Sequence, residues 1–172
     1  CIPTIFISYT GEALDTKTPL LRSMQALSDQ ALRIVRLFGD YESTKVTAYV
    51  GPEQEYFLID KEKYLQRKDL IYANRTLFGA MPPKGQEMDD HYFGSIRPRV
   101  GAFMKEVNEE MWRLGVCAKT QHNEAAPAQH ELAPVYTQVN VAVDHNQMVI
   151  EARKPIAGHH GLTCLLQEKP FA

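Results

Sequence analysis

The sequence predicts an α+β fold: part of a curved antiparallel sheet with helices flanking it. Two stretches, near residues 18–38 and 98–114, carry apolar residues at helical spacing and predict helices. Between and after them, short segments with alternating or β-branched side chains predict strands. Because the helices and the strands occur separately rather than in strict alternation, an antiparallel sheet is favoured over a doubly wound parallel one.

Composition sets the class of protein. The chain has 172 residues, of which 44% are hydrophobic and 23% charged, as expected for one globular domain without a membrane span. Nineteen basic and 21 acidic residues give a net charge of −2, so a basic surface for nucleic acid is not expected. Cys1, Cys117 and Cys164 are widely spaced without a CxxC pair, which indicates a reducing cytoplasm rather than a disulfide framework or zinc knuckle.

The start of the chain has no basic segment ahead of its short apolar run, so no signal peptide is predicted. It also lacks an initiator Met and opens directly in apolar sequence, and the last residues, LLQEKPFA, stop within a pattern. We therefore expect both termini to be cuts through a longer protein.

The first predicted helix runs from Thr18 to Phe38. Thr18 is expected to cap it, Pro19 suits the first helical position, and Gly39 follows its end. One apolar stripe is expected to be buried, consisting of Leu20, Met24, Leu27, Ala31, Ile34 or Val35, and Phe38.

Lys45–Val50 and Glu53–Asp60 are predicted strands, divided by Gly51 and Pro52. From Arg67 to Arg97 no periodicity is sustained, and glycines and prolines recur. An excursion of that length in a compact domain is typical of a functional segment or a subunit contact.

The second predicted helix spans Pro98–Leu114, with Trp112 at the margin of its buried stripe and Gly115 after its end. That stripe comprises Val100, Phe103, Met104, Val107, Met111 and Leu114. The remaining predicted elements are strands at Cys117–Glu124 and Ala128–Leu132, broken at Pro127; a helix within Thr137–Lys154, which Pro155 would kink or end; and a last strand at Leu162–Leu166.

The segment GPEQEYFLID is the first in which chemistry is indicated. Side chains alternate along a strand, so Glu53 and Glu55 share one face with Phe57 and Ile59. Two such carboxylates lie roughly 6.6–7 Å apart at the backbone and can hold hard cations such as Mg²⁺ or Mn²⁺. The alternative is a solvated strand edge with two ordinary surface carboxylates.

The segment TQHNEAAPAQHELAPVY is the second in which the residues indicate chemistry. Glu124 and Glu131 are an odd number of positions apart, so a straight strand would put them on opposite faces, but a turn at Pro127 could bring both to one site. On this interpretation His122 shares the face of Glu124, while His130 points away from Glu131. For either histidine the alternative is a hydrogen-bonded structural role.

Together these segments place four glutamates on strand-like sequence with few neighbouring bases. Such carboxylates would repel one another unless divalent metal neutralised them. Oxygen ligands favour Mg²⁺ or Mn²⁺ and phosphoryl chemistry, since zinc would prefer more nitrogen or sulfur.

These residues resemble a known family. GPEQEYFLID and HNEAAPAQHELAP are similar to the metal-binding segments of glutamine synthetases, and LLQEKPFA to the strand that leads into the next motif. IPTIFISYTGEALDTKTPLL, DDHYFGSIRPRV and AVDHNQM resemble the type III branch, the large bacterial form. The resemblance implies that Glu55, Glu124 and Glu131 bind the metal beside glutamate and ammonium. It also implies that Glu53 binds the metal that bridges the nucleotide phosphates, with His122 on the nucleotide or substrate side.

The same resemblance implies a glutamate–ammonia ligase. ATP phosphorylates the glutamate side chain, and ammonia displaces phosphate from the γ-glutamyl phosphate; Mg²⁺ or Mn²⁺ assists. It further implies a cytoplasmic homo-oligomer, a dodecamer of two stacked hexameric rings, without nucleic acid or membrane partners. Residues 1–172 would be a partial catalytic domain, lacking the N-terminal small domain and the C-terminal half. We therefore expect the chain alone to be inactive and poorly soluble.

Three positions depart from the family pattern: Gln121 stands where Arg is expected, Gln167 where His is expected, and Pro155 interrupts a stretch usually kept helical. Alternatives remain open: another ATP-dependent carboxylate–amine ligase or guanidino kinase of similar fold, a non-catalytic relative, or an α+β domain with exposed carboxylates.

Overall fold

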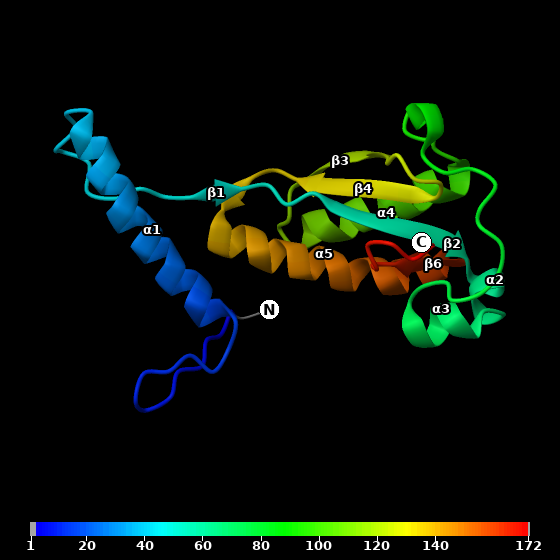
Figure 1. Cartoon of the computed structure of the whole chain (residues 1–172), viewed down its shortest axis with the longest axis horizontal. Coiled ribbons are helices and arrows are strands. Elements are labelled where there is room, and N and C mark those ends of the chain that lie inside the picture. Colours follow the sequence, from blue (N-terminus) through cyan, green and yellow to red (C-terminus); the bar gives the residue numbers. More distant parts are fainter. Residues whose placement is uncertain (1–2, 172) are drawn as a thin grey trace. The chain divides into compact units, whose positions relative to one another are not determined.

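A computed structural model describes residues 3–171, and the chain divides into two compact units (Figure 1). The first unit comprises the residues up to Gly51 together with Tyr136–His145. The second comprises Pro52–Val135 and the residues from Asn146 onward. The predicted functional residues all belong to the second unit.

The first unit is built on helix α1 (Lys17–Leu37) and a two-stranded ladder, in which β1 (Tyr49–Val50) pairs antiparallel with β5 (Thr137–Gln138). Of the strand predicted at residues 45–50, only the last two residues enter the ladder. The prediction was wrong for the others because the partner strand is only two residues long, and a strand needs a partner for its backbone hydrogen bonds.

The predicted first helix is confirmed, but its start differs. Thr18 does not cap the helix: it lies inside the first turn, and its backbone N–H donates to Oδ1 of Asp15 at 3.0 Å. An aspartate ahead of the helix thus satisfies one of the N–H groups that a helix start leaves free. Thr18 itself is buried.

The apolar stripe expected on this helix is not buried as predicted. Leu27 is 54%, Ile34 59% and Phe38 88% exposed, whereas Thr18, Ser28 and Leu32 are the buried positions. Helical spacing identifies an apolar face, but whether anything covers that face depends on segments far away in the sequence.

The second unit contains a four-stranded sheet with the order β3-β4-β2-β6, and each neighbouring pair is antiparallel. This agrees with the predicted α+β class. Its strands match three of the predicted segments and the predicted last strand: β2 (Gln54–Asp60), β3 (Ala118–Asn123), β4 (Gln129–Pro134) and β6 (Leu162–Leu165).

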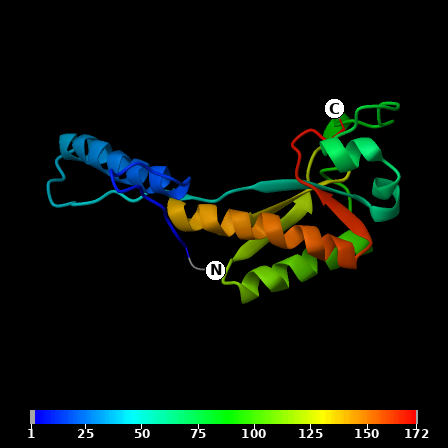
Figure 2. The ribbon, with the colours of Figure 1, turned by 90° about the horizontal axis from the view of Figure 1, so that it is seen from below.

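Two helices cover one face of this sheet: α4 (Pro98–Arg113) and, within this unit, the part of α5 (Val139–His159) that follows His145 (Figure 2). Tyr56 and Leu132 of the sheet pack there in one core. Complete burial of an apolar side chain contributes about 1.5–3 kcal/mol, so this core is the main support of the sheet. From the helices it receives Phe103, Met104, Val107, Met111, Val149, Ile156 and Ala157.

Two expectations for these helices need correction. Leu114 is 47% exposed and follows α4 instead of completing its stripe, while Trp112 lies at the margin as predicted and donates its Nε1–H to the Ala118 carbonyl. Helix α5 continues past Pro155 to His159. Pro155 is exposed, whereas Ile156 and Ala157 next to it are buried. We infer that core packing holds the helix together across the proline, although proline is unfavourable there.

The opposite face of the sheet is largely free of helices and carries the predicted site. At one end, Phe57 and Leu165 pack with Leu70 in a smaller apolar cluster. Helix α2 (Lys61–Leu65) follows β2 directly. The excursion predicted from Arg67 to Arg97 contains α3 (Lys68–Ala73) and a short 3₁₀ helix at Glu87–Asp89, and is otherwise irregular. No helix among residues 3–171 has the length and apolar character to cross a membrane.

Candidate metal centre

Strand register brings three of the predicted residues into one row. Glu55 of β2 lies directly opposite Glu131 of β4, and Glu131 lies directly opposite His122 of β3. Side chains that face each other across antiparallel strands project from the same side of the sheet, with Cβ atoms about 4.5–5.5 Å apart. The row lies on the side away from the α4–α5 core, because Tyr56 and Leu132, which alternate with these residues, point into that core.

The turn between β3 and β4 brings Glu124 to the same row. The Glu124 N–H donates to the Gln129 carbonyl at 2.9 Å, and the Gln129 N–H donates to the Ala126 carbonyl at 3.1 Å. Ala128 closes this turn in the left-handed region, with φ 63°. The expected convergence of Glu124 and Glu131 at the Pro127 turn is therefore present.

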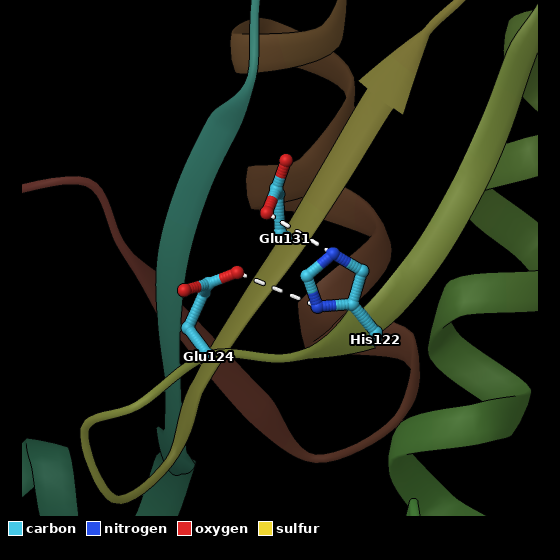
Figure 3. A group of neighbouring side chains, drawn as sticks. All are labelled: His122, Glu124 and Glu131. Atoms are coloured by element: carbon cyan, nitrogen blue, oxygen red, sulfur yellow. Dashed lines mark ion pairs between the residues drawn. The ribbon is translucent and has the colours of Figure 1, made fainter. Parts of the chain in front are cut away.

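The His122 imidazole contacts both glutamates, each through a different ring nitrogen (Figure 3). Its Nδ1 is 3.4 Å from Oε1 of Glu124, and its Nε2 is 3.1 Å from Oε2 of Glu131. Each of the three residues offers one possible metal-ligand atom, and these three atoms lie within 4.8 Å of one another, close enough to share one ion. His122 thus lies among the carboxylates.

Electrostatics at this group favour a bound cation. The pKa of Glu131 is raised to about 7, first because the residue is buried and then because Glu124 and Glu53 add hydrogen bonding and negative charge nearby; His122 opposes the shift. Nδ1 of His122 also lies 2.9 Å from the Asn123 carbonyl, so a neutral imidazole would donate there and leave Nε2 as an acceptor. The His122–Glu131 contact then needs one shared proton, which a metal ion could replace.

Glu55 and Glu53 are near this group but outside it. The Glu55 carboxylate accepts a hydrogen bond from Nε2 of Gln129 at 2.7 Å, while Glu53 precedes the first residue of β2 and is exposed. Both line a cavity of about 900 Å³ together with Glu124. The cavity is also lined by residues 81–82, 84–86 and 166–171.

The His130 side chain points away from Glu131, as predicted. It is 5% exposed, lies near the Tyr56 ring, and pairs its Nδ1 with Oδ1 of Asn123 at 2.9 Å. Burial, and secondarily the charge of His91, lowers the pKa of His130 to about 4. A neutral, hydrogen-bonded imidazole away from the carboxylates has a structural role.

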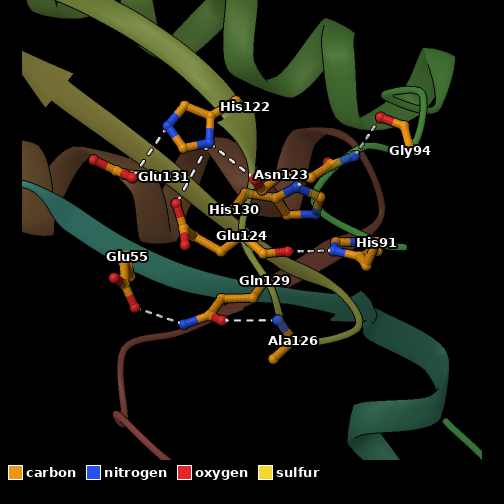
Figure 4. Close-up of polar contacts among 10 residues, drawn as sticks. All are labelled: Glu55, His91, Gly94, His122, Asn123, Glu124, Ala126, Gln129, His130 and Glu131. Carbon is orange, nitrogen blue, oxygen red and sulfur yellow. Dashed lines mark hydrogen bonds and ion pairs between the residues drawn. The ribbon is translucent and has the colours of Figure 1, made fainter. Parts of the chain in front are cut away.

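Two contacts from the excursion were missing from the sequence interpretation (Figure 4). Nδ1 of His91 lies 2.7 Å from the Glu124 carbonyl, and Nδ2 of Asn123 donates to the Gly94 carbonyl at 3.0 Å. These contacts anchor the turn that carries Glu124. Nothing local in the sequence indicates them, because they join segments about 30 residues apart.

Gln121 and Gln167, two of the positions that depart from the family pattern, lie outside the row of carboxylates. Gln121 donates its Nε2–H to the Met104 carbonyl at 2.7 Å and so ties β3 to α4. Gln167 is exposed in the cavity wall. Among residues 3–171, no hydrogen bond joins either side chain to the row of carboxylates. The possible metal ligands are therefore carboxylate oxygens and one imidazole, which suits Mg²⁺ or Mn²⁺.

Comparison with known proteins agrees with the resemblance in the sequence. Residues 32–172 match the family model of the glutamine synthetase catalytic domain, and residues 1–23 match that of the glutamine synthetase type III N terminus.

Two curated relatives are similar over almost the whole chain. A glutamine synthetase of Butyrivibrio fibrisolvens is 56% identical over 99% of this chain, and a type-3 glutamine synthetase of Dictyostelium discoideum is 51% identical over 100%. The chain spans about a quarter of their lengths, 24% and 23% respectively.

A solved structure supports the fold. The cryo-EM structure of Plasmodium falciparum glutamine synthetase superposes with a TM-score of 0.50 at 17% identity, covering 69% of this chain and 26% of that one. The chain therefore belongs to the glutamine synthetase family, in its type III branch.

Proposed function

We propose that this chain is the metal-holding part of a glutamate–ammonia ligase, which forms glutamine from glutamate, ammonia and ATP through a γ-glutamyl phosphate. The observation that carries the proposal is the row of Glu55, Glu131 and His122 across three strands, with Glu124 folded onto it. The row lies in a chain whose family is named for this reaction.

We assign Glu55, Glu124 and Glu131 to one cation and Glu53 to a second cation nearer the nucleotide. When bound, Mg²⁺ or Mn²⁺ would neutralise the negative charge of the transferring phosphoryl group. The protein residues hold and orient the ligands: the turn at Pro127 fixes Glu124, and Glu131 would bind a cation in its deprotonated form. His122 contacts both carboxylates, and we assign it to the nucleotide or substrate side, as the resemblance implies.

The cavity beside these residues is the proposed place for substrates. Its volume of about 900 Å³ is at the upper end of the range typical of small-molecule sites. It is lined on one side by Glu53, Glu55 and Glu124. Lys169 also lines the cavity beside Glu168, together with Lys84, which is paired with Asp90, so we expect the metal rather than lysine side chains to supply most of the positive charge for an anionic nucleotide.

Activity would belong to the longer protein. We propose that residues 1–172 form a partial catalytic domain, and that the working enzyme is a cytoplasmic homo-oligomer, a dodecamer. Because the chain spans about a quarter of its relatives, substrate contacts supplied by the remainder would be lacking, and the 172-residue chain alone should not turn over.

The assignment is tested by Mn²⁺ titration of the full-length protein, using calorimetry. Glu124→Gln and Glu131→Gln should each weaken Mn²⁺ binding by about tenfold or more, since each removes a charged ligand. Glu151→Gln is the matched control, because Glu151 is an exposed glutamate of α5 paired with Lys154, and it should leave binding unchanged. Unchanged affinity in both site variants would overturn the metal assignment.

Activity is tested separately by glutamine formation with ATP, glutamate and ammonia. The full-length protein should form glutamine, and both site variants should lose most of that activity. The 172-residue chain should form none; substantial turnover by this chain would contradict its description as a partial catalytic domain.

A further inference from the structure

We propose that Gln129 is a positioning residue that orients the Glu55 carboxylate for cation binding. The inference rests on the proposed function, since it concerns how one of the assigned ligands is held. It adds a residue that does not bind the cation but decides how Glu55 is presented to it.

Gln129 is placed for this by strand register. It lies opposite Phe57 on β2, so Glu55 is its diagonal neighbour on the same face of the sheet. The side chain is only 8% exposed, although Glu55 itself is exposed. A buried amide thus donates to a carboxylate on an exposed residue.

Both ends of the Gln129 amide are engaged (Figure 4). Nε2 donates to Oε2 of Glu55 at 2.7 Å, and Oε1 accepts from the Ala126 N–H at 3.3 Å. The two bonds determine which way the amide faces, because only its nitrogen can donate to a carboxylate and only its oxygen can accept from a backbone N–H. Gln129 therefore joins the strand that carries Glu55 to the turn that carries Glu124.

This connection matters because an exposed glutamate has many rotamers to lose when it binds a cation. A hydrogen bond that already holds the carboxylate reduces that loss. Partners of metal ligands commonly contribute in this way, and their removal typically lowers metal affinity or activity by about 10–100-fold. An anchored Oε2 also limits the directions that the rest of the carboxylate can take.

The test measures Mn²⁺ affinity of the full-length protein by calorimetry, in a double-mutant cycle. Gln129→Met keeps the length of the side chain and removes both hydrogen bonds; we expect about 10–100-fold weaker binding. In a Glu55→Ala background the same substitution should cause little further loss, because Gln129 acts through Glu55. Gln121→Met is the control: its amide bonds the Met104 carbonyl, and Mn²⁺ affinity should not change.

Three results would overturn the inference: unchanged affinity in Gln129→Met, an equal loss with and without Glu55, or unchanged affinity in Glu55→Ala. The second would place the effect in the turn, through Ala126. If Glu55→Ala binds normally while Glu124→Gln and Glu131→Gln do not, the inference fails together with the assignment of Glu55, and the metal site at Glu124 and Glu131 stands. If none of the glutamate variants changes affinity, the proposed function fails as well.

Discussion

His122 and Glu131 face each other across β3 and β4, with Nε2 and Oε2 3.1 Å apart. The pairing puts an imidazole against a carboxyl group that burial and neighbouring glutamates push toward its protonated form. A proton therefore occupies a position that a divalent cation would compete for, and the competition depends on pH.

Mn²⁺ affinity is predicted to rise with pH through neutrality. Because the pKa of Glu131 is about 7, a cation must displace its proton below that pH, and affinity should fall by up to about tenfold per pH unit. Titrations between pH 6 and pH 8 would measure the slope. In Glu131→Gln, Mn²⁺ affinity should be lower and should depend less on pH, whereas Glu151→Gln should keep the pH dependence of the wild type. A wild-type affinity independent of pH would contradict the prediction.

Stability without metal should follow the opposite trend with pH. The pKa of Glu131 is about 7 in the folded state against an ordinary 4.5, so between these values the folded state binds more protons than the unfolded state. Unfolding free energy should therefore fall as pH rises across this window. Urea unfolding at pH 5 and pH 7, with EDTA present, should show a larger decrease for the wild type than for Glu131→Gln.

Asn123→Leu is predicted to destabilise the second unit by about 1–3 kcal/mol, the usual range for leaving a buried polar partner unsatisfied. Asn123 is 4% exposed and bonds both His130 and the Gly94 carbonyl, so the substitution removes an acceptor and a donor together. Urea unfolding provides the measurement. Gln147→Leu, at an exposed position of α5, should stay within about 0.5 kcal/mol of wild type; equal effects would argue against a structural role for the Asn123 bonds.

Asp69→Asn is predicted to lower stability at neutral pH but not in acid. Arg67 binds both oxygens of the Asp69 carboxylate, which also accepts from the Leu77 N–H, and these bonds hold the pKa of Asp69 well below its usual range. With a depressed folded pKa, the stabilisation is complete above the unfolded pKa and is lost as pH falls through the folded one.

Urea midpoints at pH 7 and near pH 2 should therefore show a gap between wild type and Asp69→Asn that shrinks in acid. Asp29→Asn is the control, since Asp29 is exposed on α1 and bonds only to Gln25 among the contacts described here. A gap that is the same at both pH values would mean that the charge of Asp69 does not matter.

The exposed apolar face of α1 predicts self-association of the 172-residue chain. Replacing Leu27 and Ile34 by Gln should reduce the apparent size measured by light scattering without lowering the melting temperature, because both side chains are more than half exposed. Leu32→Gln is the contrasting variant, since Leu32 is 7% exposed and the change should destabilise the protein. A monodisperse monomer before substitution would contradict the expectation of poor solubility.

Local patterns predicted most elements of this fold. Helical spacing identified α1 and α4, and strand patterns identified β2, β3 and β4 with the break at Pro127 between the last two. These signals are reliable because side-chain periodicity reflects backbone geometry within a few residues. The same alternation correctly separated His122 from His130.

Non-local features escaped the sequence. The strand predicted at residues 45–50 depended on how long its partner was, and the buried stripe of α1 on what covers it. Helix α5 runs past Pro155 because packing of its buried residues outweighs the local preference. His91 carries no local signal at all, since its contact with the Glu124 carbonyl exists only after the excursion folds over the turn.

By itself the sequence determined which residues could bind metal: four glutamates in two segments, and the faces on which strand alternation puts them. Only the tertiary structure decided which of them meet. Register set Glu131 between Glu55 and His122, the turn added Glu124, and Gln129 bonds the Glu55 carboxylate. Strand pairing joins residues distant in the chain, and a shift of one residue would send each side chain to the other face, so no local pattern could specify the row.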